Sequence, residues 1–180
     1  MNNLQRFFAE TRSEIAGDTL RGHAAVFDTI ATIGRGYEAI ARGAFAPVLS
    51  NDVRALINHD PSLLLGRVSA GTLRLQEDSQ GLAFEVDLPD TQPARDLRAL
   101  IERGDITGAS FAFQPGQMTR TRAADGKTLI THTAFSALRD VSPVTFPAYS
   151  ETDIALRALD LTGSLRGQLI RLRASQLENI

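Results

Sequence analysis

The chain has 180 residues, 43% of them hydrophobic, and a formal net charge of −2 from 19 basic and 21 acidic side chains. This length suits one domain with a substantial core, and the balanced charge gives nucleic-acid binding little electrostatic support. No cysteine is present, which excludes disulfides, thiolate zinc sites and a cysteine nucleophile. No apolar stretch has membrane length and the N-terminus lacks a signal-peptide pattern, so we expect a cytosolic protein without membrane contact.

Short β-like runs separated by turn residues predict an α+β fold with a mostly antiparallel β-barrel or sheet core and a few flanking helices. The runs span residues 21–28, 53–58, 71–76, 81–88, 108–114, 127–135 and 137–143. Apolar residues alternate with polar ones on both sides of a polar segment at 77–81, which predicts a hairpin over residues 71–88.

Two helices are predicted to interrupt the strands. The first spans about 43–50, with Phe45 and Val48 on its apolar side. The second spans 91–104, because Thr91 can cap it, its leucines form an apolar stripe and Gly104 can end it. After residue 149 the pattern changes to leucines and arginines, which predicts a core domain over 1–155 and a helical tail over 156–180.

His59 is the first candidate for a catalytic base. It follows the apolar run VRALIN and precedes Asp60 and Pro61, so it is expected at a strand end entering a turn, fixed by the scaffold yet reachable. A structural or solvated histidine is the alternative at such a position. His23 and His132 lie within strand patterns and are interpreted as sheet-surface residues.

Ser110 and Asp140 are candidates for the nucleophile and the acidic group. Alternation along SFAF places the Ser110 hydroxyl on the face opposite Phe111 and Phe113, although a small serine can simply fill a tight space. Asp140 lies inside a β-like run, where an inward carboxylate would need a partner and an outward one would be a surface acid. There is no spaced cluster of metal ligands, no Walker A loop and no GxGxxG, so no metal or cofactor is expected.

Five segments follow one another between about residues 22 and 155: GHAAVFD, GAFAPVL, NHDPSLLLGRVSAGTLRLQEDSQGLAFEVDLPDT, RGDITGASFAF and LRDVSPVTFPAY. In this order they resemble the prohead proteases of tailed phages, a family related in fold to the herpesvirus assemblin proteases. The resemblance implies a serine peptidase with Ser110 as nucleophile, His59 as base and Asp140 as third member. Similar sequences often have Glu at the position of Asp140, and they commonly have Tyr at the position of His23.

The same resemblance implies that the enzyme works inside the assembling procapsid and cleaves the scaffold, the major capsid protein, or both. It also implies self-cleavage and a homodimer, with the tail over 156–180 as a packaging or self-cleaved segment. Two alternatives remain at this point. One is a non-enzymatic assembly factor with the same fold, and the other is a small β-barrel binding module in which the three side chains lie far apart.

Overall fold

A computed structural model describes the backbone of residues 5–9, 14–16 and 18–146, and the side chains of residues 18–146. All of these belong to the first of two units into which the chain divides, Met1–Ala148. The helical tail predicted for residues 156–180 lies outside the described residues, and the domain division at 155 stays a prediction.

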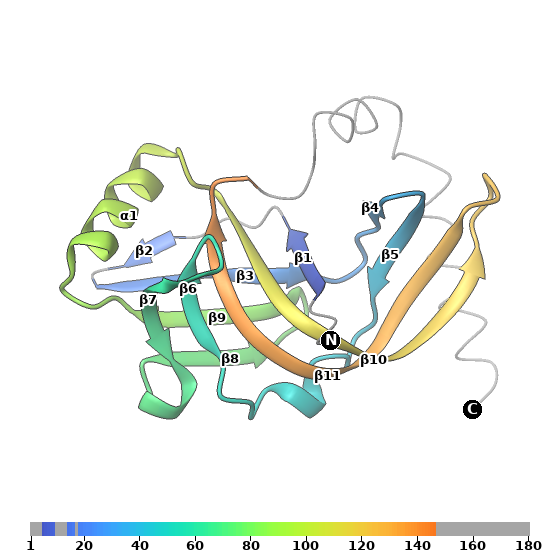
Figure 1. Cartoon of the computed structure of the whole chain (residues 1–180), viewed down its shortest axis with the longest axis horizontal. Helices are drawn as coiled ribbons and strands as arrows, with labels where there is room; N and C mark the ends of the chain where they lie inside the picture. Colours follow the sequence, from blue (N-terminus) through green and yellow to red (C-terminus); the bar gives the residue numbers. More distant parts are fainter. Residues whose placement is uncertain (1–4, 10–13, 17, 147–180) are drawn as a thin grey trace. The chain divides into compact units, whose positions relative to one another are not determined.

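The described residues form two sheets, one α-helix and two short 3₁₀ helices (Figure 1). The larger sheet runs β1-β10-β11-β5-β4, and the β6–β7 hairpin joins the same edge of β11 as β5 does. The smaller sheet runs β2-β3-β9-β8. The element bounds are β1 Gln5–Ala9, β2 Glu14–Ala16, β3 Thr19–Val26, β4 Ala31–Ile33, β5 Gly36–Ile40, η1 Ala46–Val48, β6 Arg54–Ile57, β7 Asp60–Arg67, η2 Val68–Ala70, β8 Leu73–Glu77, β9 Gly81–Asp87, α1 Gln92–Arg103, β10 Gly108–Arg122 and β11 Thr128–Val144.

The sheet architecture is confirmed as mostly antiparallel, whereas the barrel alternative is wrong. Among the described strands the two sheets do not close on each other, because no ladder connects β2-β3-β9-β8 to the larger sheet. Parallel pairing occurs only where β11 meets β5 and β6, among the described ladders. The fold is therefore α+β, with two open sheets packed around one core.

The predicted hairpin and the second predicted helix are both confirmed. β8 and β9 pair antiparallel across the turn at residues 78–80, and α1 ends at Gly104, whose φ of 83° favours glycine. Thr91 precedes α1 but makes no side-chain capping bond. The first predicted helix is reduced to the 3₁₀ turn η1 at Ala46–Val48, where the carboxylate of Glu77 accepts the backbone N–H groups of Gly43 and Phe45.

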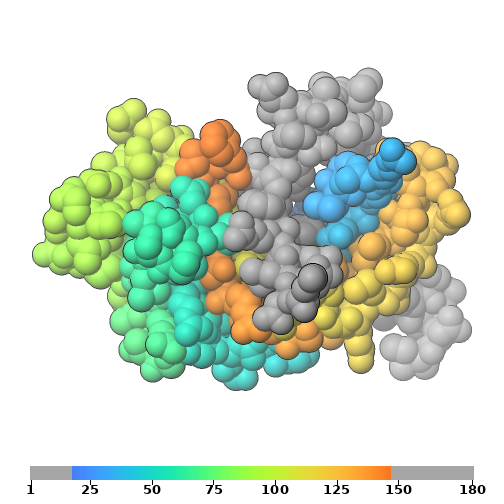
Figure 2. Space-filling model, viewed as in Figure 1, coloured from blue at the N-terminus to red at the C-terminus, as the bar shows by residue number. Residues whose placement is uncertain are grey.

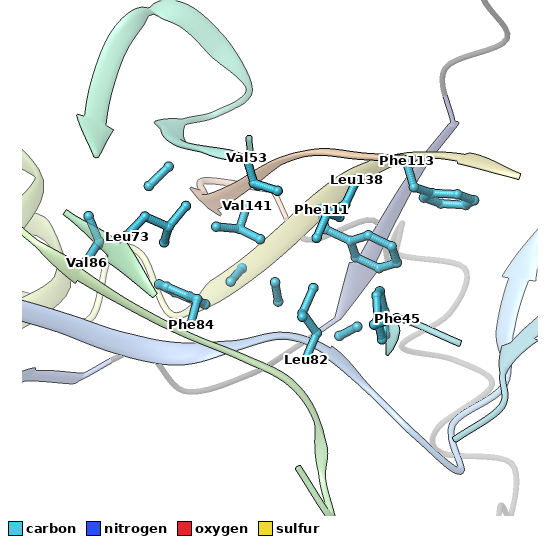
Figure 3. Close-up of a cluster of buried hydrophobic side chains, with 14 of the residues drawn as sticks. Phe45, Val53, Leu73, Leu82, Phe84, Val86, Phe111, Phe113, Leu138 and Val141 are labelled. Carbon is cyan, nitrogen blue, oxygen red and sulfur yellow. The ribbon is translucent and has the colours of Figure 1, made fainter. Parts of the chain in front are cut away.

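The core between the sheets contains a cluster of phenylalanines (Figure 3). Phe45 lies with its ring centroid 4.8 Å from that of Phe135 and 5.3 Å from that of Phe111, which in turn stacks on Phe113 at 5.1 Å. Aromatic pairs at these separations add to the stabilisation that burial provides. Because Phe111 and Phe113 point into the core, the alternate residues of β10 point to the opposite face.

Candidate active site

His59 lies in a two-residue turn between β6 and β7. Ile57 pairs with Asp60, so Asn58 and His59 form the loop, and both have positive φ, 52° and 59°. Two consecutive positive φ values are the signature of a type I′ hairpin turn. The predicted place of His59 at a strand end is confirmed, but Asp60 and Pro61 begin β7 and do not extend the turn.

Hydrogen bonds fasten this turn to the end of β11. The backbone N–H of Asn58 donates to the carbonyl of Pro143 at 3.0 Å. Its side-chain oxygen accepts the Thr145 N–H at 2.8 Å, and its side-chain amide donates to the Thr145 hydroxyl at 3.1 Å. In the space-filling view the β6–β7 segment (teal) accordingly lies beside the end of β11 (orange) (Figure 2). The turn therefore has a fixed position relative to β11.

The ladder between β10 and β11 places the other polar candidates on one face. Ser110 pairs with Ser142, and Phe111 pairs with Val141. In an antiparallel ladder paired residues share a face, and Phe111 and Val141 are fully buried in the core. Ser110 and Ser142 therefore share the opposite face, as the alternation along SFAF predicted for Ser110.

A β-bulge at Arg139 allows Leu138 to lie in the core while Asp140 lies on the face of Ser110. Ala112 pairs with Asp140, but the next pair along β10 is Phe113 with Leu138, so Arg139 is the extra residue. Leu138 and Val141 are three residues apart and both lie in the core, which strict alternation would not allow. The bulge restores the core face for Leu138 and leaves Asp140 on the face of Ser110.

The structure brings together Ser110, His59 and Asp140, the three residues that the resemblance indicated, with His59 within hydrogen-bond distance of the other two. His59 Nε2 lies 2.8 Å from Ser110 Oγ, and His59 Nδ1 lies 2.5 Å from Asp140 Oδ1. An ionised carboxylate only accepts, so Nδ1 donates to Asp140 and Nε2 is left to accept the Ser110 hydroxyl proton. This tautomer is the one in which the imidazole can receive a proton from the serine.

Burial decides whether Asp140 is an inward carboxylate with a partner or an acid at the surface of the strand. The residue is 7% exposed and is paired with His59, so the surface-acid alternative is wrong. Ser110 is completely buried and His59 is 8% exposed, so the hydrogen bonds between them are shielded from competing water. Asp60, next to His59 in the chain, is directed elsewhere: its carboxylate accepts from the Ser62 hydroxyl and N–H, which lowers the pKa of Asp60.

The other two histidines lie apart from this group. His23 contacts Asp78 at 2.8 Å near the β8–β9 turn and is half-buried. His132 is 1% exposed, packs against Phe113 and Phe135, and contacts Glu38 at 3.3 Å. The sheet-surface interpretation of His132 is therefore wrong, because its imidazole lies among these aromatic rings and not at the surface.

Sequence reasoning missed Ser142, whose hydroxyl donates to Asp140 Oδ1 at 2.9 Å. It lies two residues after Asp140, and this spacing along a strand places two side chains on one face. Within residues 18–146, no group of three or more His, Asp or Glu side chains is placed to hold a metal ion. None of the helices there is long and apolar enough to cross a membrane.

Comparisons with known proteins indicate the family and a similar fold. Residues 8–164 match the family described as caudovirus prohead serine protease. Among solved structures, the capsid assembly protease gp21 of bacteriophage T4 is similar, with a TM-score of 0.51 and 14% identity over 80% of this chain and 98% of that one. No curated protein matches the sequence.

Proposed function

We propose that Ser110, His59 and Asp140 are the catalytic triad of this chain, which belongs to the caudovirus prohead serine protease family and is therefore a serine endopeptidase of capsid maturation. The observation that supports the triad is the unbroken set of hydrogen bonds from Ser110 through His59 to Asp140, at 2.8 Å and 2.5 Å. A nucleophile and a base within this range, with the base oriented by a third group, are typical of activated serines.

The chemistry follows from the different roles of the two ring nitrogens of His59. As Ser110 Oγ attacks the carbonyl carbon of the scissile peptide, His59 Nε2 accepts the hydroxyl proton. The resulting imidazolium donates through Nδ1 to Asp140, which stabilises its charge and holds its orientation. The proton then passes from Nε2 to the leaving amine. A water molecule, deprotonated by the same nitrogen, hydrolyses the acyl-enzyme and frees Ser110.

The substrates that we propose are the major capsid protein and the scaffold, which is the role that the family's name indicates for a prohead protease. Enclosure of enzyme and substrates in one particle raises their effective concentration, so weak intrinsic binding of each cleavage site is sufficient. We further propose that the chain is made in the cytoplasm and acts inside the assembling procapsid.

Three finer expectations belong to the same proposal. Self-association into a homodimer is expected from the resemblance to herpesvirus assemblin proteases, and sedimentation of the purified protein tests it. A kinship of fold with those proteases is likewise proposed. Self-cleavage within the tail is tested by the intact mass after incubation, and an unchanged mass in both wild type and Ser110→Ala contradicts it.

The decisive experiment is co-expression with the cognate major capsid protein, read by intact mass. Ser110→Ala and His59→Ala should each abolish trimming. The first variant removes the nucleophilic oxygen, and the second removes the nitrogen that accepts and returns the proton. The matched controls are His23→Ala and Ser136→Ala, where Ser136 is a serine of β11 whose hydroxyl donates to the carbonyls of Gln114 and Pro115. Both controls should retain trimming.

Each other outcome has a clear meaning. Trimming that persists in Ser110→Ala or His59→Ala contradicts the assignment of the triad. Particles that assemble with no trimming in any variant, wild type included, favour the non-enzymatic assembly factor.

A further inference from the structure

We infer that Ser142 is a positioning residue that acts on the catalytic group through Asp140. Its hydroxyl donates to Asp140 Oδ1 at 2.9 Å, and the same oxygen accepts from His59 Nδ1 at 2.5 Å. Ser142 is completely buried and lies directly across the ladder from Ser110. The inference rests on the proposed function, because it concerns how the third member of the triad is held.

The geometry gives the hydroxyl a specific effect. A carboxylate oxygen has two lone pairs, and on Asp140 Oδ1 one faces His59 and the other faces Ser142. The terminal torsion of an aspartate is broad and has no sharp preference of its own. Because His59 and Ser142 both donate to Oδ1, they restrict the range of this torsion and keep Oδ1 in line with the imidazole N–H.

The same bond defines what Ser142 does not do. Because the ionised carboxylate cannot donate, the hydroxyl proton of Ser142 is directed to Asp140. Ser142 is therefore not held as a second nucleophile, although it lies beside Ser110 on the same face. Its position explains why a small polar side chain occupies a fully buried site between two strands: an alanine there would remove one of the two donors to a buried acid.

A merely structural serine and a positioning serine differ in what their loss changes. If Ser142 only fills space, Ser142→Ala leaves the turnover rate and the His59–Asp140 contact unchanged. If it positions Asp140, kcat falls and KM does not, because the oriented acid matters most when the imidazole becomes charged. Threonine retains the hydroxyl and should preserve most of the activity, which separates the donor from the volume of the side chain.

The experiment uses the full-length chain and initial rates of trimming at a series of concentrations of purified cognate capsid protein. For Ser142→Ala we expect kcat to fall about tenfold, the effect typical of losing one hydrogen bond to a charged group, with KM unchanged. Ser142→Thr should restore kcat, and Ser136→Ala should match wild type. In parallel, proton NMR follows the far-downfield resonance of His59 Nδ1–H, which should shift or broaden in Ser142→Ala.

The outcomes separate this inference from the proposal on which it rests. A Ser142→Ala enzyme with wild-type kcat and an unchanged His59 resonance overturns the positioning role, while inactive Ser110→Ala still supports the triad. A higher KM with unchanged kcat also overturns it, since the effect would then be on substrate binding. If Ser110→Ala trims at the wild-type rate, the triad fails, and the resonance in Ser142→Ala still decides whether Ser142 orients Asp140. Should Ser142→Thr not fold, the resonance in Ser142→Ala decides the question.

Discussion

His59 has a backbone conformation that side chains with a β-carbon rarely adopt, and its imidazole contacts both Ser110 and Asp140. A strained backbone conformation of this kind persists only where hydrogen bonds and packing around it hold it in place, and such conformations cluster at functional sites. Here the surrounding bonds come from Asn58, which joins the turn to Thr145 and Pro143. Asn58 also suits its own φ of 52°, because asparagine tolerates the left-handed region better than most residues.

Two replacements of Asn58 distinguish the contribution of its hydrogen bonds from that of its tolerance for a positive φ. Asn58→Ala loses the bonds to Thr145 and adds left-handed strain, so unfolding free energy should fall by about 1–3 kcal/mol. Asn58→Gly loses the same bonds without the strain and should be more stable than the alanine variant by roughly 1 kcal/mol. Urea unfolding measures both. Equal stability of the two variants would show that the turn is not strained.

At the scale of elements, the β10–β11 hairpin provides two of the three proposed catalytic side chains, and the bulge at Arg139 lets Leu138 pack in the core beside one of them. The backbone N–H of Leu138, beside the bulge, donates to the side-chain oxygen of Asn51 at 3.0 Å. Asn51 precedes β6, so this bond ties the bulge to the element that leads to His59. Bulges next to active sites commonly redirect a side chain in this way.

Asn51→Ala tests whether this bond holds the bulge. The variant leaves the Leu138 N–H without its acceptor, which should destabilise the protein by about 1–3 kcal/mol and slow capsid-protein trimming. Asn51→Asp is the matched control, because it keeps an acceptor oxygen at the same reach and should stay near wild type in both measurements. If the alanine variant has the unfolding free energy and the trimming rate of the wild type, the bond to Asn51 does not hold the bulge in place.

Local patterns predicted those parts of the fold that local chemistry determines. The hairpin over 71–88 and the helix ending at Gly104 follow from alternation, an apolar stripe and a glycine stop. Two runs at 127–135 and 137–143 are instead one strand, because a register shift leaves Ser136 between the pairs Ala137–Gln114 and Phe135–Pro115 and breaks the alternation there. β7 was missed since DPSLLLGR lacks alternation, and η1 is shorter than predicted because Glu77, distant in sequence, binds the turn.

The same distinction applies to the site. The resemblance indicated Ser110, His59 and Asp140, and the structure brings them within hydrogen-bond distance, while their catalytic roles stay a prediction. Ser142 and Asn58 could not be identified from composition or motif. Their importance depends on strand register and on a turn conformation, which only the folded chain specifies.

At the scale of the whole molecule, several carboxylates are held ionised by their partners. A hydrogen bond from Arg67 lowers the pKa of Asp52 well below its ordinary value of 3.8. A hydrogen bond from the Tyr37 hydroxyl, with help from Lys127, lowers the pKa of Asp125 to about 2. Burial raises the pKa of Asp78, but hydrogen bonds from Gly81, His23 and Gln80 outweigh it and leave the pKa lowered.

These shifts predict the response of the fold to acid. A carboxylate with a lower pKa in the folded state adds stability that is fully present above its unfolded pKa and is lost as pH falls through its folded pKa. The urea midpoint should therefore decline as pH drops from about 4 toward 2. In Tyr37→Phe this decline should be smaller, since Asp125 loses its first partner. A midpoint that rises on acidification would contradict the prediction.

The order of the strands along the chain also fixes when the enzyme becomes competent during its synthesis. β11 is the last described strand, and it pairs with β10 and β6, provides Asp140, and leads to Thr145, which holds the turn of His59. A growing polypeptide on the ribosome therefore contains the serine and the histidine well before the strand that aligns them. With the triad as proposed, proteolysis begins only in molecules synthesised past residue 145, so unfinished chains do not attack the proteins around them.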